Sequence, residues 1–121
     1  MSYSLNLDHR NGVVVLTYTG EVSAAELRQS RADAAASVEA GGVQRLLVDF
    51  RHAVPKFTME DAFKLTASHA GIFPRGTRVA MVVAEGRLSD FAEFSVTVAR
   101  NRGFRMEAFA DVPAAVRWLA A

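Results

Sequence analysis

The chain has 121 residues and a mass of 13.1 kDa, the size of one domain with one hydrophobic core, so we expect a single domain over residues 1–121. Half of the residues are hydrophobic and 22% are charged, a balance that excludes a disordered chain. The formal net charge of +1, with basic and acidic residues interspersed, argues against nucleic acid as a partner, and the absence of cysteine excludes disulfides, thiolate metal sites and a thiol nucleophile.

The sequence carries no targeting, metal or cofactor signal. No apolar run is long enough for a secretory signal or a bilayer-spanning helix, which leads us to expect a cytoplasmic protein. The histidines, His9, His52 and His69, lack the spacing of metal ligands, so no metal is predicted. Glycine-rich phosphate loops and the GxGxxG, GxSxG and HExxH motifs are absent, so neither a cofactor nor catalysis is predicted.

The first predicted elements are a hairpin and a helix. Alternating apolar residues over 3–7 and a β-branched, aromatic run over 13–18 flank an Asn-Gly pair, the pattern of an antiparallel hairpin. Ser23 followed by Glu26 is the signature of a capping box, so a helix is predicted to begin there. Two glycines, of which Gly42 is the second, are predicted to end it.

The rest of the chain alternates strands with helices. Short unbroken apolar runs predict strands covered on both faces, and they alternate with helical patterns that begin at capping residues. The predicted strands cover residues 45–50, 78–83 and 104–109, and the predicted helices begin at Thr58, Ser89 and Asp111. The order ββαβαβαβα predicts an α/β fold with about four helices and a five-stranded mixed, mostly parallel sheet whose one antiparallel strand lies at or near an edge.

The inner face of the helix after Thr58 is predicted from its periodicity. Apolar or small residues recur at helical spacing along it. The predicted inward-facing residues are Met59, Ala62, Phe63, Thr66 and Ala70.

The stretch from Arg45 to Asp61 contains the predicted functional site. Its strand is expected to end near Asp49 and to lead into a polar, cationic loop, and ligands of open α/β sheets bind beyond the carboxyl ends of the strands. Arg87 follows the fourth strand and is predicted to reach the same rim of the molecule. The candidate ligand-binding or partner-binding residues are Asp49, Arg51, His52, Lys56, Phe57, Thr58 and Arg87.

The charged candidates have two interpretations. In the first, Asp49, Arg51, His52 and Lys56 form an anion or carboxylate site in which His52 transfers a proton. In the second, Asp49 accepts N–H bonds from the following loop and the cations are solvated loop residues, which is the more common situation.

Thr58 also has two interpretations. A phosphate on Thr58 would meet the free N–H groups at a helix N-terminus, with Arg51 and Lys56 near enough to pair with it. Alternatively, Thr58 is only the N-cap, and Glu60 and Asp61 would repel a phosphate dianion. The capping interpretation is favoured.

The order of elements, with the LLVDF strand, the capped helix after it and the closing AFADVPAAVRWLAA segment, resembles the STAS domains and is most similar to the SpoIIAA-like proteins. The resemblance implies a small α/β domain that acts by binding, as an anti-sigma-factor antagonist, a regulatory module of an anion transporter, or a stand-alone protein suspected of holding a lipid-like ligand. In the signalling members the matching strand ends in an aspartate, which Asp49 matches, and a phosphorylatable residue and a glycine-containing helix start follow. Here the segment from Phe50 to Phe57 is long, cationic and without glycine, and Thr58 is the only hydroxyl at the helix start, which argues against the usual switch.

These observations predict a non-enzymatic regulatory or binding module that presents the ends of the third and fourth strands and the start of the second helix to a protein partner. The alternative is a carrier of a small amphipathic or lipid-like ligand, with aromatic residues around its tail and Arg51, Lys56 or Arg87 at its head group. A third hypothesis is a small enzyme that uses His52 and Asp49. Pairing of the first strand's free edge with a second copy predicts a homodimer as well.

Overall fold

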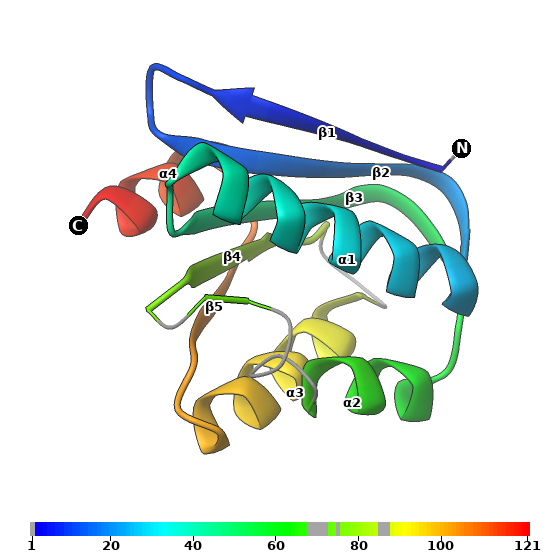
Figure 1. Cartoon of the computed structure of the whole chain (residues 1–121). Helices are drawn as coiled ribbons and strands as arrows, with labels where there is room; N and C mark the ends of the chain where they lie inside the picture. Colours follow the sequence, from blue (N-terminus) through cyan, green and yellow to red (C-terminus); the bar gives the residue numbers. More distant parts are fainter. Residues whose placement is uncertain (1, 68–72, 75, 85–87) are drawn as a thin grey trace.

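The computed structural model describes residues 2–67, 73–74, 76–84 and 88–121, and its elements follow the predicted order (Figure 1). Five strands form a sheet in the order β1-β2-β3-β4-β5, in which β1 is antiparallel to β2 and the other neighbours are parallel. The strands are β1 (Tyr3–Asp8), β2 (Val13–Ser23), β3 (Arg45–Lys56), β4 (Arg78–Val82) and β5 (Arg105–Phe109). The helices are α1 (Ala24–Gly41), α2 (Met59–Ala67), α3 (Leu88–Asn101) and α4 (Val112–Ala120). The predicted α/β fold is confirmed.

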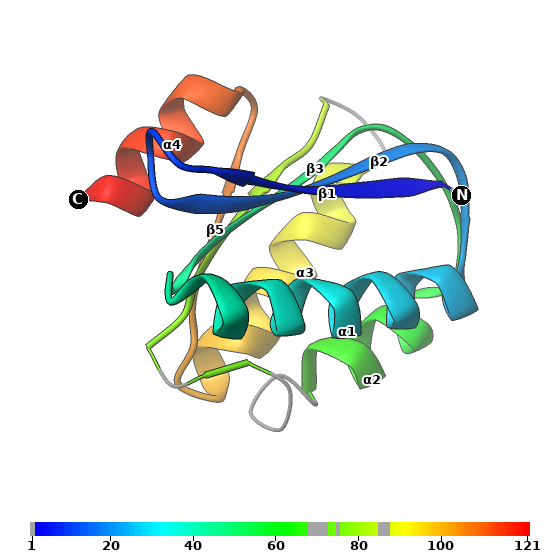
Figure 2. The same cartoon turned by 45° about the horizontal axis from the view of Figure 1, so that its top comes forward.

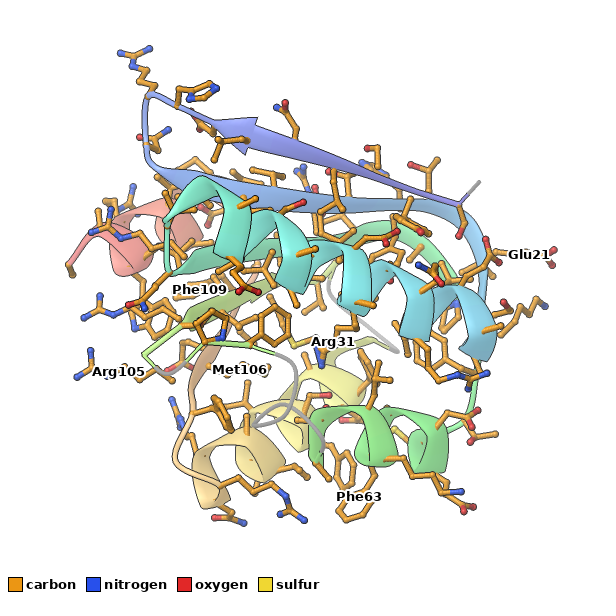
Figure 3. The ribbon with its side chains drawn as sticks, in the orientation of Figure 1. Glu21, Arg31, Phe63, Arg105, Met106 and Phe109 are labelled. Carbon is orange, nitrogen blue, oxygen red and sulfur yellow. The ribbon has the colours of Figure 1, made fainter. Side chains whose placement is uncertain are left out.

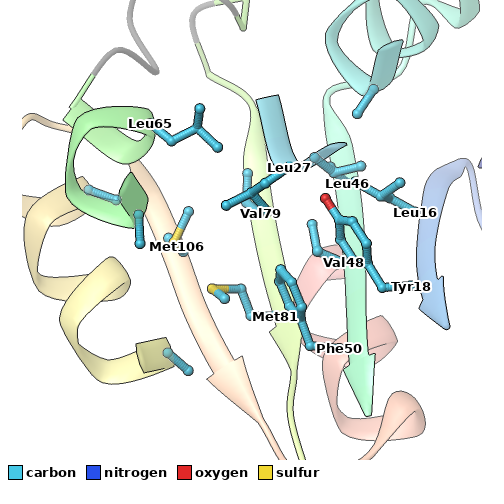
Figure 4. Packing of buried hydrophobic residues seen from close by; sticks show 14 of the residues in the cluster. Leu16, Tyr18, Leu27, Leu46, Val48, Phe50, Leu65, Val79, Met81 and Met106 are labelled. Atoms are coloured by element: carbon cyan, nitrogen blue, oxygen red, sulfur yellow. The ribbon is translucent and has the colours of Figure 1, made fainter. Parts of the chain in front are cut away.

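Helices cover both faces of the sheet. Right-handed crossovers between strands that are neighbours in both sequence and space place α1, α2 and α3 on one face, and α4 lies on the other (Figure 2). A large core under α1 to α3 includes Leu16, Tyr18, Val48, Phe50 and Met81 (Figure 4). A smaller core under α4 consists of Val13, Leu47, Ala80, Val82, Ala115 and Leu119. Because the central strands are covered on both sides, they are the unbroken apolar runs that the sequence shows.

The hairpin turn and the limits of the first helix are confirmed. Gly12 has a φ of 65°, and its N–H donates to the Asp8 carbonyl at 2.8 Å. The N–H of Glu26 donates to Ser23 Oγ at 3.1 Å and the N–H of Ser23 donates to Glu26 Oε1 at 3.3 Å, which completes the capping box. Gly42, with a φ of 66°, ends α1.

β3 is longer than predicted, which changes the nature of the site. The sequence predicts a loop after residue 50, but β3 continues to Lys56 and pairs with an extended β2. A bulge between Asp49 and His52 gives β3 one extra residue relative to β2. β4 pairs with β3 only as far as Asp49, so the second half of β3 has one described strand neighbour and carries exposed side chains. Cationic residues are compatible with such a strand, and the prediction of a loop was wrong.

α2 turns a different face to the core than predicted. The structure buries Ala62 and Thr66 as expected, but Met59 and Phe63 are 45% and 40% exposed. Ala70 lies outside the described residues. The helix is short and packs mainly against α3, and Ala62, Leu65 and Thr66 fill its inner face while Met59 and Phe63 point outward. The prediction for Met59 and Phe63 was wrong.

β1 lies at the edge of the sheet, as predicted, and β2 is its only strand partner among the described residues. Pairing of this edge with a second copy stays a prediction. Within the described part of the chain, no helix combines the length and the apolar composition that a membrane crossing requires.

Candidate functional site

The candidate site lies where β3 separates from β4. The pairing of Asp49 with Val82 is the last between these strands, whereas β3 continues along β2 for seven more residues, to Lys56. Side chains alternate between the two faces of a strand, so Asp49 lies on the same face as Leu47, the face that α4 covers. This is the carboxyl end of the parallel strands, where α/β folds place their ligand and partner sites.

Asp49 and Arg51 bind each other. Arg51 Nε donates to Asp49 Oδ1 at 3.0 Å, Arg51 Nη2 donates to Oδ2 at 2.9 Å, and the main-chain N–H of Arg51 donates to Oδ1 at 3.0 Å. Burial alone would raise the pKa of the Asp49 carboxyl, but the hydrogen bonds and charge of Arg51, with a contribution from His52, hold that pKa below its usual range. Both carboxylate oxygens therefore already have donors. The main-chain N–H bond is the one that the second interpretation of the charged residues predicts, but Arg51 is an ion-paired residue of β3 and not a solvated loop residue.

Replacement of Asp49 by asparagine is expected to lower the free energy of unfolding at pH 7 by about 1–2 kcal/mol, because the ion pair with Arg51 is lost while the partly exposed guanidinium can be hydrated. The folded-state pKa of Asp49 is depressed, so the carboxylate stabilises the protein above its unfolded pKa of about 3.9, and this stabilisation is lost as the pH falls through the folded-state pKa. Urea unfolding of both proteins from pH 7 to pH 2 measures the difference. A difference that stays constant over the whole range would contradict the assignment.

The other candidates from β3 do not converge on one point. Lys56 Nζ lies 3.5 Å from Glu21 Oε1, and both side chains are exposed. His52 is exposed at the bulge. Phe57 packs against the large core, with its ring centroid 5.3 Å from that of Phe91. The end of β3 is therefore a polar surface in which the charges are paired with near neighbours.

Thr58 caps α2, as the favoured interpretation predicts. The N–H of Asp61 donates to Thr58 Oγ1 at 3.1 Å, and the N–H of Thr58 donates to Asp61 Oδ2 at 2.9 Å. Hydrogen bonds to the Asp61 carboxylate, first from the Thr58 main chain and then from its side chain, lower the pKa of that carboxyl. Phosphorylation of the exposed Thr58 hydroxyl stays a prediction.

Exposed apolar side chains lie beside this cap. Met59 opens α2, and Phe63 follows one turn later and points away from the sheet (Figure 3). The Phe63 ring centroid lies 6.1 Å from that of Phe94 on α3, and the guanidinium carbon of Arg102 lies 5.7 Å from the Phe63 ring. We call Met59, Phe63 and Phe94 the α2–α3 patch. Assigning Ala62, Leu65 and Thr66 to the inner face of α2 would have predicted this patch from the sequence.

Sequence analysis also missed a buried arginine. Arg31 of α1 is 9% exposed and lies between α1 and the core (Figure 3). With Tyr18, Phe50 and Ser95 it lines an internal cavity of about 20 Å³. Burial lowers the pKa of Arg31 to about 10, although Tyr18 partly opposes this effect. No sequence pattern marks this position as buried, because an arginine on a helix is normally exposed.

Arg87, the remaining candidate, lies outside the described residues. Its predicted position near His52, on a common rim of the molecule, therefore stays a prediction.

Comparison with solved structures finds the same architecture. An anti-sigma factor antagonist from Mycobacterium paratuberculosis is 15% identical, with a TM-score of 0.66 over 99% of this chain and 96% of that chain. The anti-sigma factor antagonist SpoIIAA in its unphosphorylated form is 17% identical, with a TM-score of 0.60 over 96% of each chain. A protein with a SpoIIAA-like fold from Shewanella loihica is 19% identical, with a TM-score of 0.60 over 97% of this chain and 91% of that chain. At these identities the similarity shows a common fold.

The family is shown by sequence. No curated protein matches the chain. The model of one family matches residues 13–120, from the first residue of β2 to the last residue of α4. The chain therefore belongs to the SpoIIAA-like family.

Proposed function

We propose that this protein is a regulatory module that acts by binding another protein through the α2–α3 patch and the adjoining start of α2. The observation that carries the proposal is the exposure of Met59 and Phe63 side by side with Phe94. Soluble domains rarely leave neighbouring large apolar side chains exposed without an interaction to cover them. Methionine, aromatic residues and arginine are enriched at protein interfaces, and Arg102 lies against the Phe63 ring.

The neighbouring polar residues support binding rather than catalysis. Asp49 forms an ion pair with Arg51, Lys56 forms an ion pair with Glu21, and His52 is exposed. Such a rim supplies specificity around an apolar contact, whereas a general base needs a partner and a positioned substrate. Two solved structures with the same fold are named as antagonists of anti-sigma factors, and we extend to this chain only their mode of action, the binding of a protein.

A carrier that encloses the apolar tail of its ligand in the core receives less support. The internal cavity next to Arg31 measures about 20 Å³, room for about one water molecule. Sites for small molecules usually enclose about 300–1,000 Å³. An acyl chain would have to displace the packed side chains of the large core.

A photo-crosslinking residue placed at Met59 is expected to form an adduct with a second protein in cells of the source organism, because the α2–α3 patch is the proposed contact. The matched control places the same residue at Ser4, which is exposed on β1. Adducts are detected by gel shift and identified by mass spectrometry. The double variant Met59→Ser and Phe63→Ser should no longer co-purify with the partner. The control variant Lys64→Ser, on the same helix, should still co-purify with it. Equal crosslinking from positions 59 and 4, or none from 59, would refute the proposal.

A further inference from the structure

Three arginines stand side by side at the end of the sheet opposite the candidate site. Arg45, Arg78 and Arg105 are the first residues of β3, β4 and β5, and the register pairs Arg45 with Arg78 and Arg78 with Arg105. Neighbouring strands lie about 4.8 Å apart, so the three residues form a row about 10 Å long. We call this row the amino edge. Figure 3 shows Arg105 and Glu21 at opposite ends of the molecule.

The three side chains share one face of the sheet. Leu47 and Ala80 belong to the core under α4, and alternation along β3 and β4 places Arg45 and Arg78 on that face. Met106 faces the opposite core, so Arg105 also lies on the α4 face. Like charges on neighbouring strands repel, so this arrangement costs stability unless an opposite charge lies against it.

Among the described residues, hydrogen-bond acceptors are found for the middle arginine of the row and not for the two beside it. Arg78 Nη1 donates to the main-chain oxygens of Trp118, at 3.3 Å, and Ala121, at the negative end of the α4 dipole. For Arg45 and Arg105 the described residues provide neither an ion pair nor a side-chain hydrogen bond. Two cations thus remain available on either side of a fixed one.

Two grooves follow the row, one on each side of Arg78. The first, of about 450 Å³, runs between Arg45 and Arg78, and its walls include the positive-φ glycines Gly12, Gly42 and Gly76, which keep side chains out of it. The second, of about 430 Å³, is lined by Arg78 and Arg105 together with Phe104 and Trp118. Its lining also includes Arg100 and Glu107, which form an ion pair with each other. Both grooves have the size of small-molecule sites.

We propose that the amino edge binds a small ligand that carries two or more linked phosphoryl groups. A guanidinium is a planar double donor that matches phosphate oxygens, and a chain of phosphoryl groups can reach from Arg45 past Arg78 to Arg105. The net charge of +1 limits the basic surface, which favours a compact anion over a long nucleic acid. This site is separate from the α2–α3 patch, so the two proposals stand or fall independently.

The test is a titration of the full chain with inorganic tripolyphosphate at low salt. Binding is measured by calorimetry and by the fluorescence of Trp118, the only tryptophan in the sequence. Saturable binding is expected, and Arg45→Gln and Arg105→Gln are each expected to weaken it about tenfold, the effect of losing one charge-assisted hydrogen bond. Arg28→Gln, the same change at an exposed position of α1, should bind like the original protein. Circular dichroism checks that each variant is folded. If Arg45→Gln does not fold, Arg105→Gln still tests the proposal independently.

Titrations with three further ligands show which kind of anion the amino edge recognises. Orthophosphate should bind more weakly than tripolyphosphate, and equal affinity would overturn the requirement for linked groups. A nucleoside triphosphate that binds more tightly than tripolyphosphate would support the site and assign an added contact to Phe104 or Trp118, whereas equal affinity would support phosphoryl recognition alone. Absence of saturation, unchanged binding by both edge variants, or an affinity that rises steadily with the length of a single-stranded RNA would overturn the proposal.

Discussion

Replacement of Phe50 by alanine is expected to lower the free energy of unfolding by about 3–5 kcal/mol. The Phe50 ring is 3% exposed, stacks on Tyr18 with centroids 4.6 Å apart, and meets the Phe91 ring edge-on at 5.6 Å. It lies within the bulge, one residue beyond the last pairing of β3 with β4, so it anchors the strand that carries the candidate site. The internal cavity already borders this ring, so its removal enlarges an existing void.

Urea unfolding followed by circular dichroism measures this loss. The matched control is Phe63→Ala, which removes the same ring from the exposed α2–α3 patch and is expected to cost about 1 kcal/mol or less. If the two variants lose the same stability, Phe50 is not a core anchor. If Phe63→Ala proves the more costly, the patch belongs to the core and the proposed interface loses its basis.

Replacement of Leu119 by alanine is expected to cost about 2–5 kcal/mol, the second large effect. Leu119 and Ala115 are the fully buried side chains of α4, and they hold this helix on the small core of Leu47, Ala80 and Val82. An alanine at position 119 leaves α4 without its main apolar contact. The hydrogen bond from the Ala114 N–H to Asp111 Oδ1, at 2.8 Å, caps the helix but does not attach it to the sheet.

Trp118 fluorescence and circular dichroism together report this effect. In Leu119→Ala the fluorescence transition in urea is expected to precede the loss of circular dichroism, because α4 leaves the sheet first. Val116→Ala removes a half-buried side chain of the same helix and should cost less. Coincident transitions with no loss of stability would mean that α4 is held by other contacts.

The fold was largely predictable because its signals are local. The capping box of Ser23 and Glu26, the glycine that ends α1 and the apolar runs of β3 and β4 each determine their own element. The second half of β3 was not predictable in this way. Its residues after the bulge pair with β2, which α1 separates from β3 in the sequence, so no local pattern reports the pairing. Their polar character reflects the fact that this segment has one described strand neighbour.

The candidate site was predictable in position but not in contacts. Asp49 and Thr58 lie where the strand and helix signals place them. Lys56 belongs to β3 and not to the predicted loop, and its ion pair with Glu21 depends on the extended pairing of β2 with β3. Arginines scattered along the sequence looked like an unremarkable charge distribution. Strand register then brings Arg45 and Arg105 to a single edge, which no local pattern reveals.

The sequential strand order has a consequence for how the protein is made. Each strand pairs with the one synthesised just before it, so the sheet can grow by adding each new strand to one open side as the chain leaves the ribosome. No strand has to insert between two that have already paired. β5 and α4 are then the last to dock, and until they do, β4 is the growing end of a partly built molecule.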